Sequence, residues 1–370
     1  MARMAVLPAL ILCLWGCSMP RGWEAVLILT DLTAGRGPSG LTEQTPPPRR
    51  LMVPYAVEGR NYRGDLYLPG ERIRAGLVLL PGAAGEGTDD PRLQAFAATL
   101  ARARFAVLVP DLAGFRSLRA GSRDIGETAD AIVWLSSRPE LSPGGKCGVA
   151  ALSYAAGPAL LAALEPRAGQ RVRFLVTVGG YYDLRNVLTF FTTGWYRDGE
   201  RWRRGTPNDY GKWVFVLANA GRIENARDRA ALEKLARRKM DDPAARTDDL
   251  ARGLGPEGKS LYDFFANTDP RQVPALMARL PEPIRRDMAD LDPSRHDLRG
   301  LATRLIIIHG RDDDIIPAAE SEALARAVPR DRRRLFVLDD LMHVELKPKL
   351  SDAFRLWQAV SAILQERDRT

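Results

Sequence analysis

Cysteine and histidine are scarce in this chain of 370 residues, which contains three of each. Cys13 and Cys17 stand in an apolar N-terminal segment, and Cys147 begins a run that is expected to be a buried strand. This distribution allows neither a disulfide framework nor a set of ligands with the spacing of a zinc site. We therefore expect no metal site, and we expect Cys147 to be a small residue of the core.

The sequence also lacks a phosphate-binding glycine loop, a nucleic-acid-binding module and any long run of one charge. The net charge of +8 comes from arginines that are distributed over the whole length. The densest clusters, Arg201, Arg203 and Arg204 and the run at 332–334, are expected to be solvated surface, with attraction of an anionic lipid or substrate as the alternative. Neither a cofactor nor a nucleic-acid partner is expected.

The N-terminus has the features of a targeting segment. Arg3 provides a positive start, residues 4–15 are apolar but too few to span a bilayer comfortably, and small residues surround Cys17. Residues 14–17 resemble the bacterial lipoprotein signal, which implies lipidation of Cys17. An uncleaved anchor, extended by the apolar run at 25–29, is the alternative. Both alternatives predict an exported protein that is tethered to a membrane in a bacterial envelope.

Residues 18–50 are predicted to be a linker between this segment, residues 1–17, and the folded domain. The second half of the stretch is rich in glycine, threonine and proline and includes three consecutive prolines at 46–48. Such a composition is typical of semi-rigid linkers. The folded domain is therefore expected to begin near Leu51.

From Leu51 onward, short apolar runs alternate with stretches of helical periodicity. The composition, 45% hydrophobic and 27% charged, is sufficient for one large core. The alternation predicts an α/β fold with an open, mostly parallel sheet and helices on both faces. The expected strands are a leading hairpin at 53–57 and 64–68, buried parallel strands at 75–80, 105–109, 147–152, 172–178 and 303–308, and a last strand at 334–338.

The strand rhythm stops between residues 184 and 299. That part contains helical stretches, prolines and many aromatic residues, and it is too long for an unstructured connection inside a compact domain. It is predicted to be a helical cap over the carboxyl edge of the sheet. The cap separates two parts of the core, residues 51–183 and 300–370.

The aromatic residues at the start of this insertion are candidates for lining a substrate pocket. Phe190, Phe191, Trp195 and Tyr196 come first after the last strand of the first core part, so they are the nearest in sequence to the sheet edge. Packing inside the cap is the ordinary role of any single one of them, because large apolar residues are usually buried.

A serine stands where an expected buried strand turns into a helix. In residues 148–157, Ser153 has the small residues Ala151 and Ala155 two positions away on either side. A sharp turn that exposes a nucleophilic serine needs small neighbours, because its backbone passes close to other elements. A serine that caps the following helix is the structural alternative.

A second string follows the expected strand at 303–308. The strand ends in His-Gly, Asp313 comes three residues later, and Pro317 opens the next helix. Together with the serine string, this pattern resembles the α/β-hydrolase superfamily, whose members have a His-Gly-x-x-Asp-x-x-x-Pro string at the equivalent place. The resemblance implies Ser153 as nucleophile and Asp313 as the catalytic acid, with Asp312 and Asp314 as neighbouring alternatives.

The histidines complete the comparison with the superfamily. His343 follows the last expected strand, so nucleophile, acid and histidine occur in the superfamily's order. The resemblance therefore implies His343 as the general base. His309 matches the strand-end histidine of the superfamily, which is structural more often than catalytic, and His296 is expected on the surface.

The same resemblance implies two backbone donors for an oxyanion. One is the amide of Tyr154, directly after the nucleophile, and the other is the amide of Ala83, in the glycine-rich loop after the strand at 75–80. An ordinary glycine-rich turn is the alternative for that loop.

These residues predict a serine hydrolase that cleaves an ester, a thioester or an amide of a small-molecule acyl substrate through an acyl-enzyme. A carboxylic ester hydrolase is the first expectation. A serine peptidase stays open, because a fold and a triad do not fix the substrate. The alternative from another class is a lipoprotein that keeps the fold for binding, without catalysis.

Overall fold

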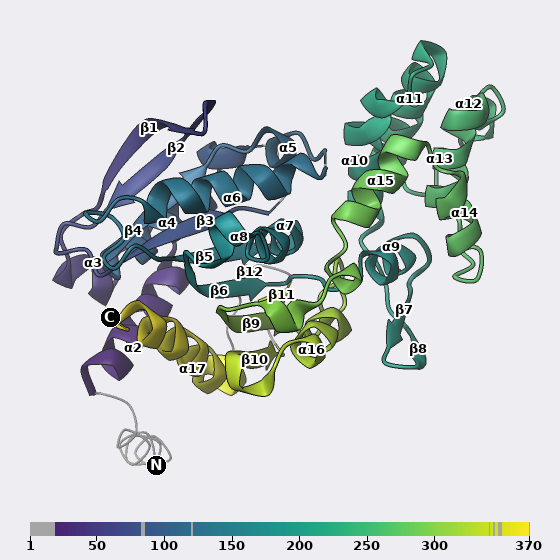
Figure 1. Cartoon of the computed structure of the whole chain (residues 1–370). Helices are drawn as coiled ribbons and strands as arrows, with labels where there is room; N and C mark the ends of the chain where they lie inside the picture. Colours follow the sequence, from purple (N-terminus) through teal and green to yellow (C-terminus); the bar gives the residue numbers. More distant parts are fainter. Residues whose placement is uncertain are drawn as a thin grey trace, which may run out of the picture.

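The computed structural model describes residues 19–82, 86–119, 121–339, 341–342, 345–346 and 350–369 (Figure 1). Eight strands form one sheet in the order β1-β2-β4-β3-β5-β6-β9-β10. The leading hairpin β1–β2 is antiparallel, β2 is antiparallel to β4, and all other neighbours are parallel. The expected mostly parallel sheet is therefore confirmed. Its strands are β1 (Arg49–Val57), β2 (Arg60–Leu68), β3 (Ala75–Leu80), β4 (Phe105–Pro110), β5 (Cys147–Leu152), β6 (Val172–Val178), β9 (Arg304–Gly310) and β10 (Arg333–Leu338).

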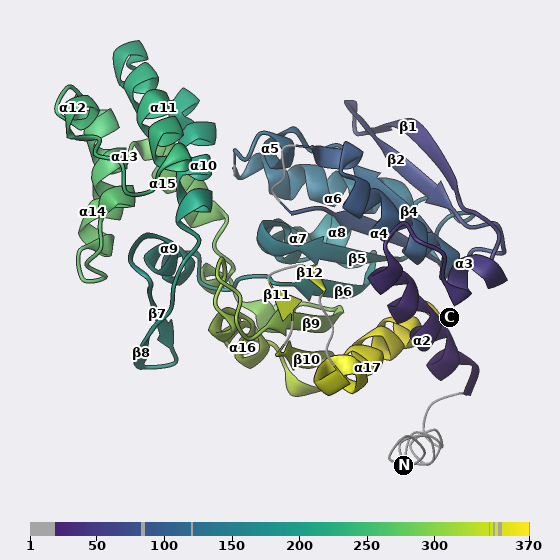
Figure 2. The same ribbon diagram turned by 180° about the vertical axis from the view of Figure 1, so that it is seen from behind.

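Helices cover both faces of the sheet (Figures 1 and 2). Successive side chains of a strand point to opposite faces, so Val78 and Leu80 of β3 pack in the core of one face and Leu77 and Leu79 in that of the other. The first face carries α6 (Arg123–Ser136), α7 (Ala156–Ala162), α8 (Pro166–Gly169) and α16 (Ala318–Ala327); the second carries α2 (Met19–Ala34), α3 (Gly40–Gln44), α4 (Pro91–Arg102) and α17 (Leu350–Arg367). The helix α5 (Ala113–Arg116) and the short ribbon of β11 (Leu341–Met342) and β12 (Glu345–Leu346) lie in connections.

Between β6 and β9 the chain leaves the sheet and forms a mostly helical cap that stands to one side of the core (Figure 1). The cap has an apolar core of its own, which includes Trp213, Leu232, Phe264 and Phe265. Its elements are α9 (Leu184–Thr193), β7 (Trp195–Asp198), β8 (Arg201–Arg204), α10 (Asp209–Asn219), α11 (Ala226–Asp241), α12 (Asp248–Ala251), α13 (Pro256–Ala266), α14 (Val273–Arg279) and α15 (Glu282–Asp290).

A buried carboxylate joins the start of the cap to the core. Glu320 of α16 accepts hydrogen bonds from the amides of Tyr182 at 3.0 Å and Asp183 at 2.7 Å, and from Nδ2 of Asn186 at 2.6 Å. Burial raises the pKa of Glu320 to about 7, although these three donors favour its charged form. The first turn of α9 is thereby fixed to a helix that packs on the sheet.

The expected linker over residues 18–50 is wrong for the part that the structure describes. Residues 19–34 form α2, which lies beside α17 in both views (Figures 1 and 2). Ala25 and Ile28 are buried in the core of that face, and Trp357 donates a hydrogen bond from Nε1 to the carbonyl of Gly22 at 2.9 Å. The apolar run at 25–29 therefore packs on the domain.

Buried charges explain why this helix escaped recognition in the sequence. The side chain of Arg367 in α17 is fully buried, and its Nη2 donates to Glu24 Oε2 at 2.9 Å. Burial raises the pKa of Glu24, but the hydrogen bond and charge of Arg367 outweigh it and hold this pKa below its usual value. Arg21 pairs with Asp368 at 3.3 Å. Arg21 and Glu24, which precede the apolar run at 25–29, thus form ion pairs with Asp368 and Arg367 near the C-terminus.

In the part of the chain that the structure describes, no helix combines the length and the apolar character that a membrane span requires. Cys17 and the rest of the expected targeting segment precede the described residues.

Candidate active site

Ser153 stands in a strained turn between β5 and α7. β5 ends at Leu152, residues 153–155 form one 3-10 turn, and α7 begins at Ala156. The φ angle of Ser153 is +53°, in the left-handed region that residues with a side chain rarely adopt. Ala155 occupies the N-cap position of α7, so Ser153 does not cap that helix. A strained serine at the end of a buried strand has the geometry of a nucleophile elbow.

Small residues make room for this turn. Ala151 and Ala155 are fully buried, as the tight approach of backbone requires. On α7, a Cβ added at Gly157 would lie 1.9 Å from the hydroxyl oxygen of Tyr181, so any larger residue would push the helix away from the end of β6. The spacing of small residues around the serine therefore has a direct steric cause.

The loop after β3 passes beside the serine. A Cβ added at Gly82 would lie 3.3 Å from Cβ of Ser153 and 4.0 Å from its Oγ. Ala83, the expected second donor to an oxyanion, follows Gly82 directly but lies outside the described residues. The described part of this loop thus ends beside Ser153.

Tyr154 is fixed beside the turn by a hydrogen bond to a buried carboxylate. Its hydroxyl donates to Oδ2 of Asp124 at 2.7 Å, and its ring packs edge-on against Phe115 and stacks near Tyr181. Burial raises the pKa of Tyr154 well above its usual value, so the hydroxyl keeps its proton. The hydrogen bond and the ring contacts therefore fix the side chain of Tyr154, whose amide is the expected first oxyanion donor.

Asp124 is the partner that sequence reasoning missed. Burial raises its pKa to about 6, while hydrogen bonds from Tyr154 and from the amide of Gly121 favour its charged form. The carboxylate also fills the space beside Gly114, where an added Cβ would lie 2.2 Å from its Oδ1. No motif marks this pair in the sequence, because only the packing of α6 against the elbow brings the two residues together.

Asp313 differs from the two acids beside it. Asp313 is buried, whereas Asp312 is exposed and Asp314 is half-buried. Its Oδ1 accepts hydrogen bonds from the amides of Ile315 at 2.9 Å and Ile316 at 2.8 Å. Backbone donors of this kind favour the charged form and fix the plane of the carboxylate. Of the three acids, Asp313 is therefore the one that is buried and held in one orientation by backbone donors.

His309 lies at the end of β9, fully buried behind this loop. Its Nε2 is 2.8 Å from the carbonyl oxygen of Ile316 and 3.3 Å from Oδ2 of Asp313, and its Nδ1 is 2.6 Å from the hydroxyl of Ser321. Because a carbonyl only accepts, Nε2 carries a hydrogen. His309 therefore supports the loop of Asp313 from inside the fold, which is a structural position.

Ser153 follows β5 and Asp313 follows β9 at the same edge of the sheet. The register aligns Leu152 of β5 with Val178 of β6, and Val178 with Ile308 of β9. The strands that carry the two residues are thus separated by β6 alone, or about 10 Å at two strand spacings. Ligand sites of open α/β sheets form at this carboxyl edge.

The neighbours of the two residues meet above β6. Tyr154 and Ile315 pack against a small apolar cluster formed by Tyr181, Val187 and Ile316. This cluster connects the turn of the serine with the loop of the acid through the first helix of the cap.

His343 lies outside the described residues, so its role as the general base beside Ser153 and Asp313 stays a prediction. Leu341, two residues earlier, contacts the end of β9, where a Cβ added at Gly310 would lie 1.6 Å from the carbonyl oxygen of Leu341. The chain that leads to the expected general base thus contacts the end of β9, three residues before Asp313.

The four aromatic candidates for a substrate pocket all lie at the start of the cap, in α9 and β7. Phe190 is 2% exposed and packs edge-on against Tyr196, with ring centroids 5.5 Å apart. Phe191 packs against the apolar core of the cap, and Trp195 is half-buried on the hairpin. Phe190 therefore has a packing role, and a pocket-lining role for the others stays a prediction.

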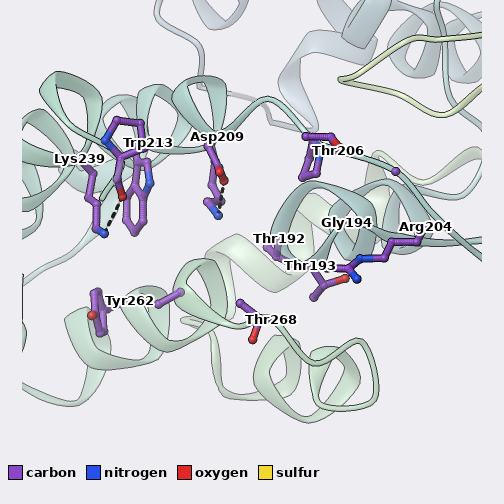
Figure 3. Close-up of a pocket in the computed structure, with 15 residues that line it drawn as sticks. Thr192, Thr193, Gly194, Arg204, Thr206, Asp209, Trp213, Lys239, Tyr262 and Thr268 are labelled. Atoms are coloured by element: carbon purple, nitrogen blue, oxygen red, sulfur yellow. Dashed lines mark hydrogen bonds and ion pairs between the residues drawn. The ribbon is translucent and has the colours of Figure 1, made fainter. Parts of the chain in front are cut away.

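A cavity of about 750 Å³ lies within the cap, and Figure 3 shows its lining. It is bounded by the end of α9, the segment that leads into α10, and the ends of α11 and α13. Neither Ser153 nor Asp313 lines it. This cavity is thus separate from the candidate active site.

No family model matches the sequence, and no curated protein sequence matches it either. Solved structures with a similar fold include a dienelactone hydrolase from Anabaena variabilis, at 16% identity over 86% of this chain and 95% of the other, with a TM-score of 0.42. A meta-cleavage product hydrolase from Pseudomonas fluorescens is 16% identical over 82% of this chain and 94% of the other, with a TM-score of 0.43. An acylaminoacyl peptidase from Pyrococcus horikoshii is 10% identical over 87% of this chain and 41% of the other, with a TM-score of 0.47.

Because these TM-scores lie below 0.5, the topology of the chain itself carries the assignment. The strained serine turn after β5 and the buried acid after β9 occur in the order that the superfamily resemblance implies, on a mostly parallel sheet with helices on both faces. The chain has the α/β-hydrolase fold.

Proposed function

We propose that this chain is a serine hydrolase that cleaves a carboxylic ester through an acyl-enzyme. The observation that supports it most is the positive φ of Ser153 at the carboxyl edge of the sheet, on the same edge as the buried carboxylate of Asp313. A strained turn lowers the stability of the fold. Such turns occur at active sites, where they expose a nucleophilic side chain. The proposed substrate is a small acyl ester, and no cofactor takes part in the mechanism.

In the proposed mechanism, His343 removes the proton from Oγ of Ser153 as this oxygen attacks the ester carbonyl. Asp313 orients the imidazole and stabilises its positive charge, and the amides of Tyr154 and Ala83 bind the oxyanion. His343 then gives the proton to the leaving alcohol, and the acyl group stays on Ser153. A water molecule, deprotonated by His343, attacks the acyl-enzyme; the acid leaves, and Ser153 recovers its proton.

The test is hydrolysis of p-nitrophenyl esters of graded chain length by the wild type and by three variants. Ser153→Ala is expected to lose activity by thousands-fold or more, and Asp313→Asn by about a thousand-fold or more. Asp312→Asn is the matched control, because it removes the same charge one residue away at an exposed position. It should keep most of the activity.

Four outcomes would redirect the proposal. Full activity of Ser153→Ala would exclude the nucleophile, and a larger loss in Asp312→Asn than in Asp313→Asn would move the acid by one residue. Turnover of acyl-peptides or thioesters in place of simple esters would indicate a peptidase or a thioesterase with the same triad. Absence of turnover on all these substrates would favour a binding lipoprotein.

We further propose that the protein is exported and tethered to the membrane of a bacterial envelope through Cys17. The support is the lipoprotein-like string at 14–17 together with the position of α2, which begins at Met19 and packs on the domain. A lipid on Cys17 would then hold the catalytic domain close to the membrane surface, with almost no spacer between them.

A further inference from the structure

The cavity within the cap has the size of a small-molecule site and an unusual charge. Its volume of about 750 Å³ lies within the range of about 300–1,000 Å³ that is typical of ligand pockets. Three cationic side chains line it, Arg204, Lys212 and Lys239, against one carboxylate, Asp209. The cavity wall therefore carries a net charge of +2.

Two of the three cations have no acidic partner. Lys212 pairs with Asp209 at 2.9 Å. Lys239 donates only to the carbonyl oxygen of Pro243 at 2.9 Å, and neither Lys239 nor Arg204 forms an ion pair with any described residue. In the part of the chain that the structure describes, the positive charge at this wall is therefore not neutralised by the protein.

Aromatic rings lie beside these cations. The Nζ atoms of Lys212 and Lys239 are 5.7 Å and 5.9 Å from the ring centroid of Trp213, within the range of cation–π contact. Figure 3 shows Lys239, Trp213 and Tyr262 grouped at one end of the cavity and Arg204 at the other. Trp213 is 4% exposed and belongs to the apolar core of the cap, so its ring contacts the two lysines and offers little surface to a ligand. Both ends of the cavity offer positive charge.

We propose that this cavity binds a small organic anion with two acidic groups, which are held at Lys239 and at Arg204. Carboxylates and phosphates both match the cations, because each accepts charge-assisted hydrogen bonds from ammonium and guanidinium groups. Thr206 and Thr268, which also line the cavity, add hydroxyl groups for such oxygens.

The site is separate from Ser153 but connected to the loop of the catalytic acid. Pro207 lines the cavity, and the amide of the next residue, Asn208, donates to the carbonyl oxygen of Asp314 at 3.0 Å. The segment that forms one cavity wall is thus bonded to the residue after Asp313. The proposal does not depend on the hydrolase assignment, because binding is measured without turnover.

The experiment measures binding to the full-length protein by isothermal titration calorimetry with three probes of similar shape: terephthalate, benzoate and benzyl alcohol. The affinity is expected to fall in that order, from two negative charges to none. Lys239→Met should weaken terephthalate binding about 10-fold, as loss of one charge-assisted contact does. Lys234→Met is the matched control, since it removes the same charge from an exposed position of the same helix outside the cavity. It should change binding by less than about two-fold.

Arg204→Met, at the opposite and exposed end, gives an independent test if Lys239→Met does not fold. Terephthalate binding equal to that of benzyl alcohol would overturn the proposal, and so would unchanged binding in both cavity variants or no saturable binding at millimolar concentrations. To separate free inorganic anions from organic ones, phosphate is titrated as a further probe. Binding of phosphate as tight as that of terephthalate would overturn the proposal of an organic ligand.

Discussion

Replacement of Asp124 by asparagine tests the buried pair under the serine turn. In the wild type, burial raises the pKa of Asp124 from its ordinary value of 3.8 to about 6. Asparagine keeps the shape and can accept the hydrogen bond from Tyr154, but it carries no charge at any pH. A comparison of the wild type with this variant therefore measures the free-energy cost of keeping a charged carboxylate buried at this site.

The magnitude follows from the pKa difference between the folded and the unfolded state. A rise of about two pKa units corresponds to about 3 kcal/mol of unfolding free energy. Because the folded-state pKa is raised, the folded state binds the proton more tightly, so this contribution favours folding at low pH. This stabilising contribution is lost as the pH rises from about 4 to about 6. Above that range Asp124 is charged in both the folded and the unfolded state, and the contribution is absent.

The assay is urea unfolding of the wild type and Asp124→Asn at about pH 4 and about pH 7.5. The wild type should be more stable relative to the variant at the lower pH, by about 3 kcal/mol compared with the higher pH. Asp312→Asn serves as the control, since its exposed side chain should leave this difference near zero. An equal difference at both pH values, or a wild type that gains relative stability as the pH rises, would refute the burial argument.

Three other predictions concern the ends of the chain and the cap. Arg367→Met should lower stability by about 3–5 kcal/mol, measured by urea unfolding, because it leaves Glu24 without its buried partner; adding Glu24→Gln should restore part of the loss. Phe190→Ala should lower the free energy of unfolding by about 3–5 kcal/mol and leave the preferred ester chain length unchanged. Trp195→Ala should leave Tm nearly unchanged. It should alter the discrimination between esters of neighbouring chain length, measured as the ratio of their kcat/KM values, by an amount equivalent to about 1–3 kcal/mol. Unaltered chain-length selectivity in Trp195→Ala would make that residue structural. Cys17→Ala should release the protein from the membrane fraction; a wild type that is found in the cytoplasm with its first residue intact would contradict the tether.

The sheet was predictable because its physical signal is local. The parallel strands are short runs such as residues 75–80, in which every side chain is buried, and β-sheet geometry produces such runs in any parallel sheet with helices on both faces. The turn at Ser153 and the loop at Asp313 were predictable for a related reason, since small residues and a proline at fixed offsets reflect steric needs of the backbone itself.

The parts that escaped prediction depend on contacts between distant residues. Arg21 and Glu24 interrupt the two apolar runs of the N-terminal sequence, yet their partners are Asp368, directly after the last helix, and Arg367, in its last turn. Asp124 has no motif, because its importance comes from the hydroxyl of Tyr154 and from burial that only the folded packing creates. Charge and burial of this kind are properties of the fold and are invisible to local patterns.

The most direct test of the central assignment is covalent labelling with a fluorophosphonate probe, which reacts with serines that are activated as nucleophiles. After labelling and digestion, mass spectrometry should locate the adduct on Ser153 alone, and labelling should be lost in Ser153→Ala and strongly slowed in His343→Ala, while Asp312→Asn labels at nearly the wild-type rate. A folded protein that stays unlabelled, or an adduct on another serine, would contradict the assignment of Ser153 as the nucleophile.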